Sequence, residues 1–80
     1  MNLEERNQFL LDVYEHQVVN GNSEAGIQKD LNAIAEYKKK LELIKYWEEK
    51  GVVEITVQAM GFTNFKLNSY GIDYVEENLK

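Results

Sequence analysis

The sequence predicts an α+β fold, in which three helices are followed by a two-stranded β-hairpin and a C-terminal helix. Before Gly51 the apolar residues recur at helical spacing. Directly after Gly51 they alternate with polar residues, which is the pattern of a half-buried strand. Asn68 then provides a capping side chain ahead of a new helical stripe.

The first helix is expected from about Leu3 to Val19. Asn2, followed three residues later by Glu5, resembles a capping box in which Asn replaces Ser or Thr. The apolar stripe of this helix consists of Leu10, Val13, Tyr14 and Val18. The Asn-Gly-Asn-Ser stretch at 20–23 is a dense turn signal that ends it.

A short second helix is expected from about Glu24 to Leu31, with Ser23 as its cap. Ile27 and Leu31 keep helical spacing, and Asn32 tolerates the backbone conformation that breaks a helix. A long amphipathic third helix then runs from about Ala35 to Lys50 and ends at Gly51. Its buried stripe is formed by Tyr37, Leu41, Ile44 and Trp47.

The hairpin is built from a first strand with alternating side chains, a turn at Gly61 and a second strand around Phe65–Leu67. Trp47 is expected near the centre of the core. We expect the hairpin to pack on the helices through Val53, Ile55, Val57 and Leu67.

The last helix begins after Asn68, whose side chain can cap the backbone amide of Tyr70 or Gly71. Leu67 and Ile72 occupy the positions of a hydrophobic staple around that cap. The buried stripe of the helix is Ile72, Val75 and Leu79.

Composition fits one domain covering residues 1–80, since the chain has 9.3 kDa and 44% hydrophobic residues. The absence of cysteine excludes disulfides, thiolate metal sites and a cysteine nucleophile. His16 is the single histidine, so we expect no metal site and no cofactor. No apolar run is long enough for a membrane span or a signal peptide, which predicts a cytoplasmic protein without membrane contact.

Catalytic patterns are missing, and we therefore expect no enzyme and no catalytic residues. His16 lies between polar neighbours on a helix, which is typical of an edge residue. Ser23 and Ser69 are explained as cap or first-turn residues. Adjacent carboxylates such as Glu48 and Glu49 point to different sides of a helix, the wrong arrangement for a shared acid–base site.

Two stretches resemble the winged helix-turn-helix superfamily. Ile44–Val53 resembles the end of that family's third helix and its entry into the wing, and Phe65–Ile72 resembles the junction from the wing to the last helix, with Asn68 in place of threonine. The resemblance implies a winged-helix fold in which the hairpin is the wing. The chain departs from the pattern at Lys39 or Lys40, where an aliphatic residue is usual, and at Asn32, where the family has glycine. Either Tyr37 and Leu41 provide the buried apolar positions of the third helix, or the turn before that helix is one residue longer than is usual in the family.

The resemblance implies a small DNA-binding transcriptional regulator that reads double-stranded DNA with its third helix and wing. The basic residues available on these elements are Lys29, Lys38, Lys39, Lys40, Lys45 and Lys66. The net charge of −5 argues against nucleic acid, although seven of the nine basic residues lie within 27–66. Glu42 and Glu49 share a helical face with Lys38 and Lys45, which equally fits a self-compensated solvated surface.

The alternative function is a protein-interaction module or accessory subunit without DNA binding. Met60 and Phe62 at the hairpin tip either fold back on the core or offer an apolar patch to a partner. Tyr70 and Tyr74 complete the candidate interaction residues. A homodimer is also predicted, because the first and last helices carry more apolar residues than one buried stripe needs: Phe9, Leu11, Val19, Tyr70, Tyr74 and Leu79.

Overall fold

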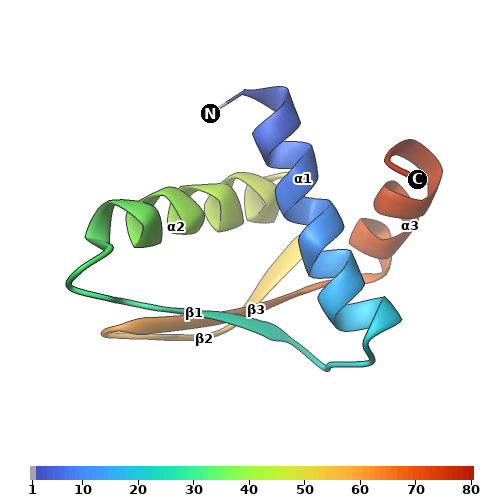
Figure 1. Cartoon of the computed structure of the whole chain (residues 1–80). Coiled ribbons are helices and arrows are strands. Elements are labelled where there is room, and N and C mark those ends of the chain that lie inside the picture. Colours follow the sequence, from blue (N-terminus) through green and yellow to red (C-terminus); the bar gives the residue numbers. More distant parts are fainter. Residues whose placement is uncertain (1) are drawn as a thin grey trace.

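The computed structural model describes residues 2–80 and has an α+β fold (Figure 1). Three α-helices and one π-helical turn are combined with a three-stranded antiparallel sheet. The elements in chain order are α1 (Leu3–Tyr14), η1 (Glu15–Val19), β1 (Ala25–Gln28), α2 (Ile34–Glu49), β2 (Val53–Ala59), β3 (Phe62–Leu67) and α3 (Ser69–Asn78).

The sheet has the strand order β1-β3-β2, so β3 is central and both other strands are edges. Side chains of β3 alternate, with Thr63, Phe65 and Leu67 buried on the face that the helices cover. We call this face the inner face and the opposite one the outer face. Helices α1 and α2 lie over the inner face, and α3 follows the end of β3 (Figure 1).

The expected second helix at 24–31 is wrong, because this segment forms β1. Its residues pair with the hairpin over a long sequence separation, with Ala25 opposite Phe65 and Ile27 opposite Thr63. The helical spacing of Ile27 and Leu31 therefore arises from a strand followed by a turn. In that turn the side chain of Asp30 accepts a hydrogen bond from the Asn32 amide at 2.9 Å.

The layout expected for the chain is corrected accordingly. Two helical segments, not three, precede the hairpin, and the hairpin belongs to a three-stranded sheet. Within residues 2–80, no helix leads into α2 across a short turn, so the helix pair of a helix-turn-helix unit is not formed. The strand β1 takes the place of its first helix.

The other helix boundaries agree with the sequence analysis. Leu3–Val19 is helical throughout, although its last turn is π-helical. Asn2 accepts a hydrogen bond from the Glu5 amide at 2.8 Å, and Asn68 accepts one from the Gly71 amide at 2.9 Å. The predicted caps at Asn2 and Asn68 are therefore confirmed. The predicted cap at Ser23 is wrong, because the strand β1 and not a helix follows it.

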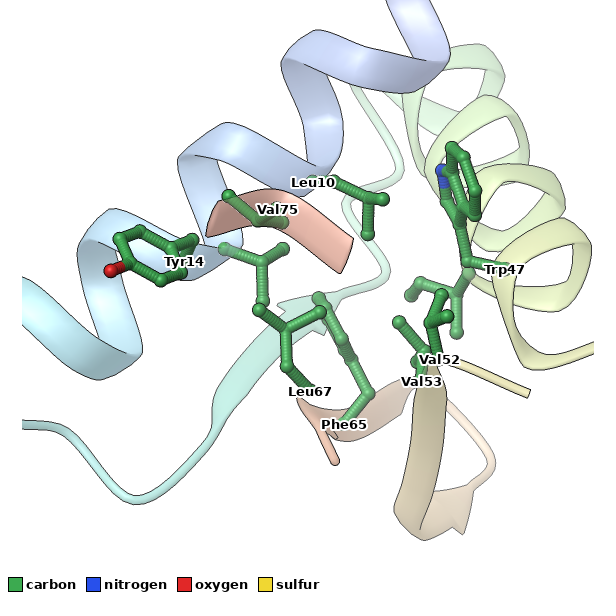
Figure 2. Close-up of a cluster of buried hydrophobic side chains, with 10 residues drawn as sticks. Leu10, Tyr14, Trp47, Val52, Val53, Phe65, Leu67 and Val75 are labelled. Atoms are coloured by element: carbon green, nitrogen blue, oxygen red, sulfur yellow. The ribbon is translucent and has the colours of Figure 1, made fainter. Parts of the chain in front are cut away.

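The core fills the space between the helices and the inner face of the sheet (Figure 2). Trp47 is 4% exposed, and its indole N–H donates to the Arg6 carbonyl oxygen at 3.1 Å, so its predicted central position is confirmed. The buried cluster contains Leu10, Val13, Tyr14, Ile44, Trp47, Val52, Val53, Phe65, Leu67 and Val75.

A bulge in β2 changes which side chains of the hairpin face the core. Ile55 is opposite Phe65, but Val57 is opposite Asn64, with a register shift between them. Val57 is thereby turned to the outer face and is 41% exposed. The prediction that it packs on the helices is wrong, whereas Val53, Ile55 and Leu67 do pack in or against the core.

Candidate interaction surfaces

The hairpin tip carries an exposed apolar surface, which we call the tip patch and define as Val57, Ala59, Met60 and Phe62. Ala59 is opposite Phe62 in the pairing of β2 with β3, so these two side chains share the outer face. Met60 is 100% exposed and Phe62 is 38% exposed. Met60 and Phe62 therefore do not fold back on the core, and the alternative of an exposed apolar surface is the one observed.

The tip patch lies in an uncharged part of a highly charged chain. Residues 55–65 contain no Asp, Glu, Lys or Arg. The nearest charged side chains in the hairpin, Glu54 and Lys66, approach each other at the hairpin base with 3.9 Å between carboxylate oxygen and Nζ. A partner can therefore cover the tip without desolvating a charge in the hairpin itself.

A further apolar side chain is exposed in the turn after β1. The amide of Lys29 donates to the carbonyl oxygen of Gly61 at 2.7 Å, which ties the end of β1 to the hairpin turn. Leu31, two residues further along, is 86% exposed. The turn after β1 thus adds to the apolar surface at this end of the molecule.

The predicted DNA-contacting lysines do not gather on one face. Lys38, Lys39 and Lys40 follow one another in α2, and successive helical residues point about 100° apart. Lys39 pairs with Glu5 of α1, which raises the pKa of Lys39 and lowers the pKa of Glu5. Lys40 lines the space between α2 and β1.

The remaining lysines of the predicted set lie in three different parts of the fold. Lys45 is seven residues after Lys38, so these two share one exposed face of α2. Lys29 lies in the turn after β1, and Lys66 lies at the hairpin base beside Glu54. Helical geometry thus places Lys38 and Lys45 on one face, and Lys66 is paired with a carboxylate in the sheet.

The two candidate tyrosines occupy different environments. Tyr70 is largely exposed at the start of α3. Tyr74 packs against the core, with its ring centroid 5.6 Å from that of Trp47. They therefore form no common surface with the tip patch.

The apolar side chains that suggested a homodimer are divided between the core and the surface. Phe9 stacks on Phe65 with 5.7 Å between ring centroids, and Leu11 and Leu79 also pack against the core. Val19 and Tyr70 remain exposed. Most of the apolar excess is thus explained within one chain, and the homodimer stays a prediction.

A cleft of about 270 Å³ separates β1 from the first half of α2; we call it the β1 cleft. The cleft was not predicted from the sequence, because a helix was expected where β1 lies. Alternation in a four-residue segment is too short a signal to reveal this strand. The cleft is lined by Gly26, Ile27, Gln28, Asp30, Ala33, Glu36, Tyr37 and Lys40.

We also searched for a metal site, a membrane-spanning helix and similar proteins of known function. Across the described residues, no group of His, Asp or Glu side chains is arranged to hold a metal ion. None of the helices formed by residues 2–80 has the length and apolar character that crossing a membrane requires. No protein-family model matches the chain, and comparison with curated proteins and with solved structures finds no significant match.

Proposed function

We propose that this protein is a protein-interaction module that docks a partner protein on the tip patch. The observation that carries the proposal is the complete exposure of Met60 at the end of a hairpin whose residues 55–65 carry no charge. Contiguous exposed apolar side chains are uncommon on soluble domains and mark interaction sites. Met is also suited to such a surface, since its flexible thioether adapts to differently shaped partners.

Charge supports this function over DNA reading. DNA-binding proteins gain affinity by placing several cations along the phosphate backbone and releasing its counterions. In this molecule Lys38 and Lys45 share a face, but Lys39 is engaged by Glu5 and Lys40 lies at the β1 cleft. With a net charge of −5, two exposed lysines provide little attraction for a polyanion.

Cross-linking at the tip tests the proposal. A photoreactive amino acid replaces Met60 in the full chain, and a matched variant carries it at the exposed position of Glu77 in α3. We expect a partner protein to be cross-linked from position 60 and not from position 77. The purified partner should then lose about tenfold or more in affinity for the double variant Met60→Ser, Phe62→Ser.

A DNA titration tests the alternative function, which is DNA binding. Random-sequence duplex at low salt should show no measurable binding to the wild-type chain. Salt-dependent duplex binding that is lost in the variant Lys38→Ala, Lys45→Ala would instead assign the protein to DNA. A cross-linked partner whose affinity is unchanged by the tip variants would also refute the tip patch as its docking site.

A further inference from the structure

One edge of the sheet has unpaired backbone groups. Strand β1 is one of the two edge strands, and successive residues of a strand direct their N–H and C=O groups to opposite sides. Because the Lys29 amide donates toward the hairpin, at Gly61, the alternate residues Gly26 and Gln28 direct theirs away from it. Two amide donors and two carbonyl acceptors therefore face the free edge of β1.

Strand β1 is short, which by itself limits strand addition, but its residues include no charge, proline or bulge to protect the edge. Exposed edges are commonly protected by a charged residue, a proline or a bulge. The opposite edge strand, β2, has both a bulge after Ile55 and the charged residue Glu54. The four residues of β1 have neither, and their sequence is Ala-Gly-Ile-Gln. The two edges of the same sheet are therefore protected to different degrees.

The β1 cleft provides space beside this edge. An added strand lies about 4.8 Å from its neighbour, and its side chains alternate between the two faces of the sheet. The cleft of about 270 Å³ runs between β1 and α2, and Ala33 and Tyr37 of the α2 side contribute to its wall. Side chains on one face of an added strand would thus contact α2.

The charges around the cleft favour a basic occupant. Asp30 and Glu36 line it, and Lys40 is its only basic lining residue. A neighbouring pocket between α1 and β1, which Lys40 also lines, adds the carboxylate of Asp12. The chain as a whole carries a net charge of −5, which attracts cationic segments at long range.

We propose that the free edge of β1 binds an extended, basic segment of a partner protein, which enters the β1 cleft and joins the sheet as a fourth strand. Backbone pairing with Gly26 and Gln28 gives the affinity, and the carboxylates of Asp30 and Glu36 select for positive charge. The site shares no residue with the tip patch. Either proposal can therefore fail without the other.

The test uses a fluorescein-labelled peptide of alternating lysine and valine, Lys-Val-Lys-Val-Lys-Val, and the full-length chain. Binding is followed by fluorescence anisotropy and by the amide resonances of the protein. We expect the amide resonances of Gly26 and Gln28 to shift on binding. The peptide in which glutamate replaces lysine should bind about tenfold more weakly or worse, because the cleft is acidic.

Alternate N-methylation distinguishes strand addition from simple charge attraction. One peptide is methylated at every valine amide and another at every lysine amide, so the charge of the two is identical. An added strand directs only one of these sets toward β1. We expect one methylated peptide to lose about tenfold in affinity and the other to keep its affinity within about threefold.

Variants of the protein give a second, independent measurement. Gln28→Pro removes an N–H that faces the free edge and makes no bond to β3, so the sheet can persist while peptide affinity falls about tenfold. Asp30→Asn with Glu36→Gln should lower both the peptide affinity and its salt dependence. The control Glu77→Gln, at an exposed position of α3, should change neither.

Three results would overturn the proposal. The first is no shift of the Gly26 and Gln28 resonances at millimolar peptide. The second is equal affinity of the two methylated peptides. The third is unchanged peptide affinity in a folded Gln28→Pro variant. If that variant does not fold, the peptide series alone decides.

Discussion

The base and the tip of the β2–β3 hairpin contain similar side chains in opposite environments. At the base, Val53, Phe65 and Leu67 are buried beneath the helices, and Val52 joins them from the preceding turn (Figure 2). At the tip, Met60 and Phe62 are exposed although they are equally apolar. Side-chain chemistry alone therefore does not decide burial in this hairpin.

The difference arises from register and from where the helices lie. The bulge after Ile55 moves Val57 and Ala59 to the outer face, which no helix of the described chain covers. Phe62 lies on that same face because side chains of β3 alternate and Phe65, three residues later, points inward. Apolar residues beyond the bulge are thus left for contacts outside the chain, which is the basis of the proposed function.

The largest expected effect comes from two phenylalanines of the same strand. Phe65→Ala should lower the free energy of unfolding by about 3–5 kcal/mol, because the ring is 2% exposed and stacks on Phe9. Phe62→Ala removes the same atoms from a partly exposed site and should cost about 1 kcal/mol or less. Urea unfolding followed by the fluorescence of Trp47 measures both variants, and similar losses in both would eliminate the distinction between base and tip.

The next effect concerns the close contact that fixes α3 to the hairpin base. A side chain at Gly71 would overlap the carbonyl oxygen of Val52 and crowd Leu67. Gly71→Ala should therefore destabilise the protein by about 3 kcal/mol or more. Gly21→Ala is a useful comparison: its added methyl meets no neighbour, and only the positive φ of 76° strains it. Gly71→Ala should be the more damaging of the two in thermal unfolding, and the reverse order would contradict the close-contact explanation.

Local signals predicted the elements around the hairpin base well. The caps at Asn2 and Asn68, the long amphipathic helix and the packing of Trp47 all depend on residues close in sequence or on a strong helical period. These features agree with the structure.

Features that depend on distant residues could not be predicted. Strand β1 exists because Ala25–Gln28 pairs with Phe62–Phe65, and no pattern within four residues reports that pairing. The bulge that turns Val57 outward is likewise set by its pairing with Asn64. For the candidate sites, the sequence identified Met60 and Phe62 but left their exposure open, and it missed the β1 cleft together with its strand.

A smaller change, this time a gain in the free energy of unfolding, is expected for a substitution at Thr63 in the middle of β3. Thr63 is buried on the inner face, and its hydroxyl has no hydrogen-bond partner among the described residues. Thr63→Val keeps the shape and removes this unpaired group, so the free energy of unfolding should rise by about 1 kcal/mol. Thr56→Val is the matched control on the outer face. There the hydroxyl donates to Glu24, so its removal should give no gain. A loss of stability in Thr63→Val would show that the hydroxyl is satisfied after all.

The smallest effect on stability is expected at the tip itself. Met60 is fully exposed, so Met60→Ser removes no packing and should change the free energy of unfolding by less than about 0.5 kcal/mol. An exposed apolar side chain contributes no packing to this fold, and under the proposed function Met60 serves in partner binding. The same substitution should therefore weaken partner binding while leaving the urea midpoint unchanged. A clear loss of stability in Met60→Ser would mean that the tip contacts the rest of the chain, and the comparison between a packed base and a bare tip would no longer hold.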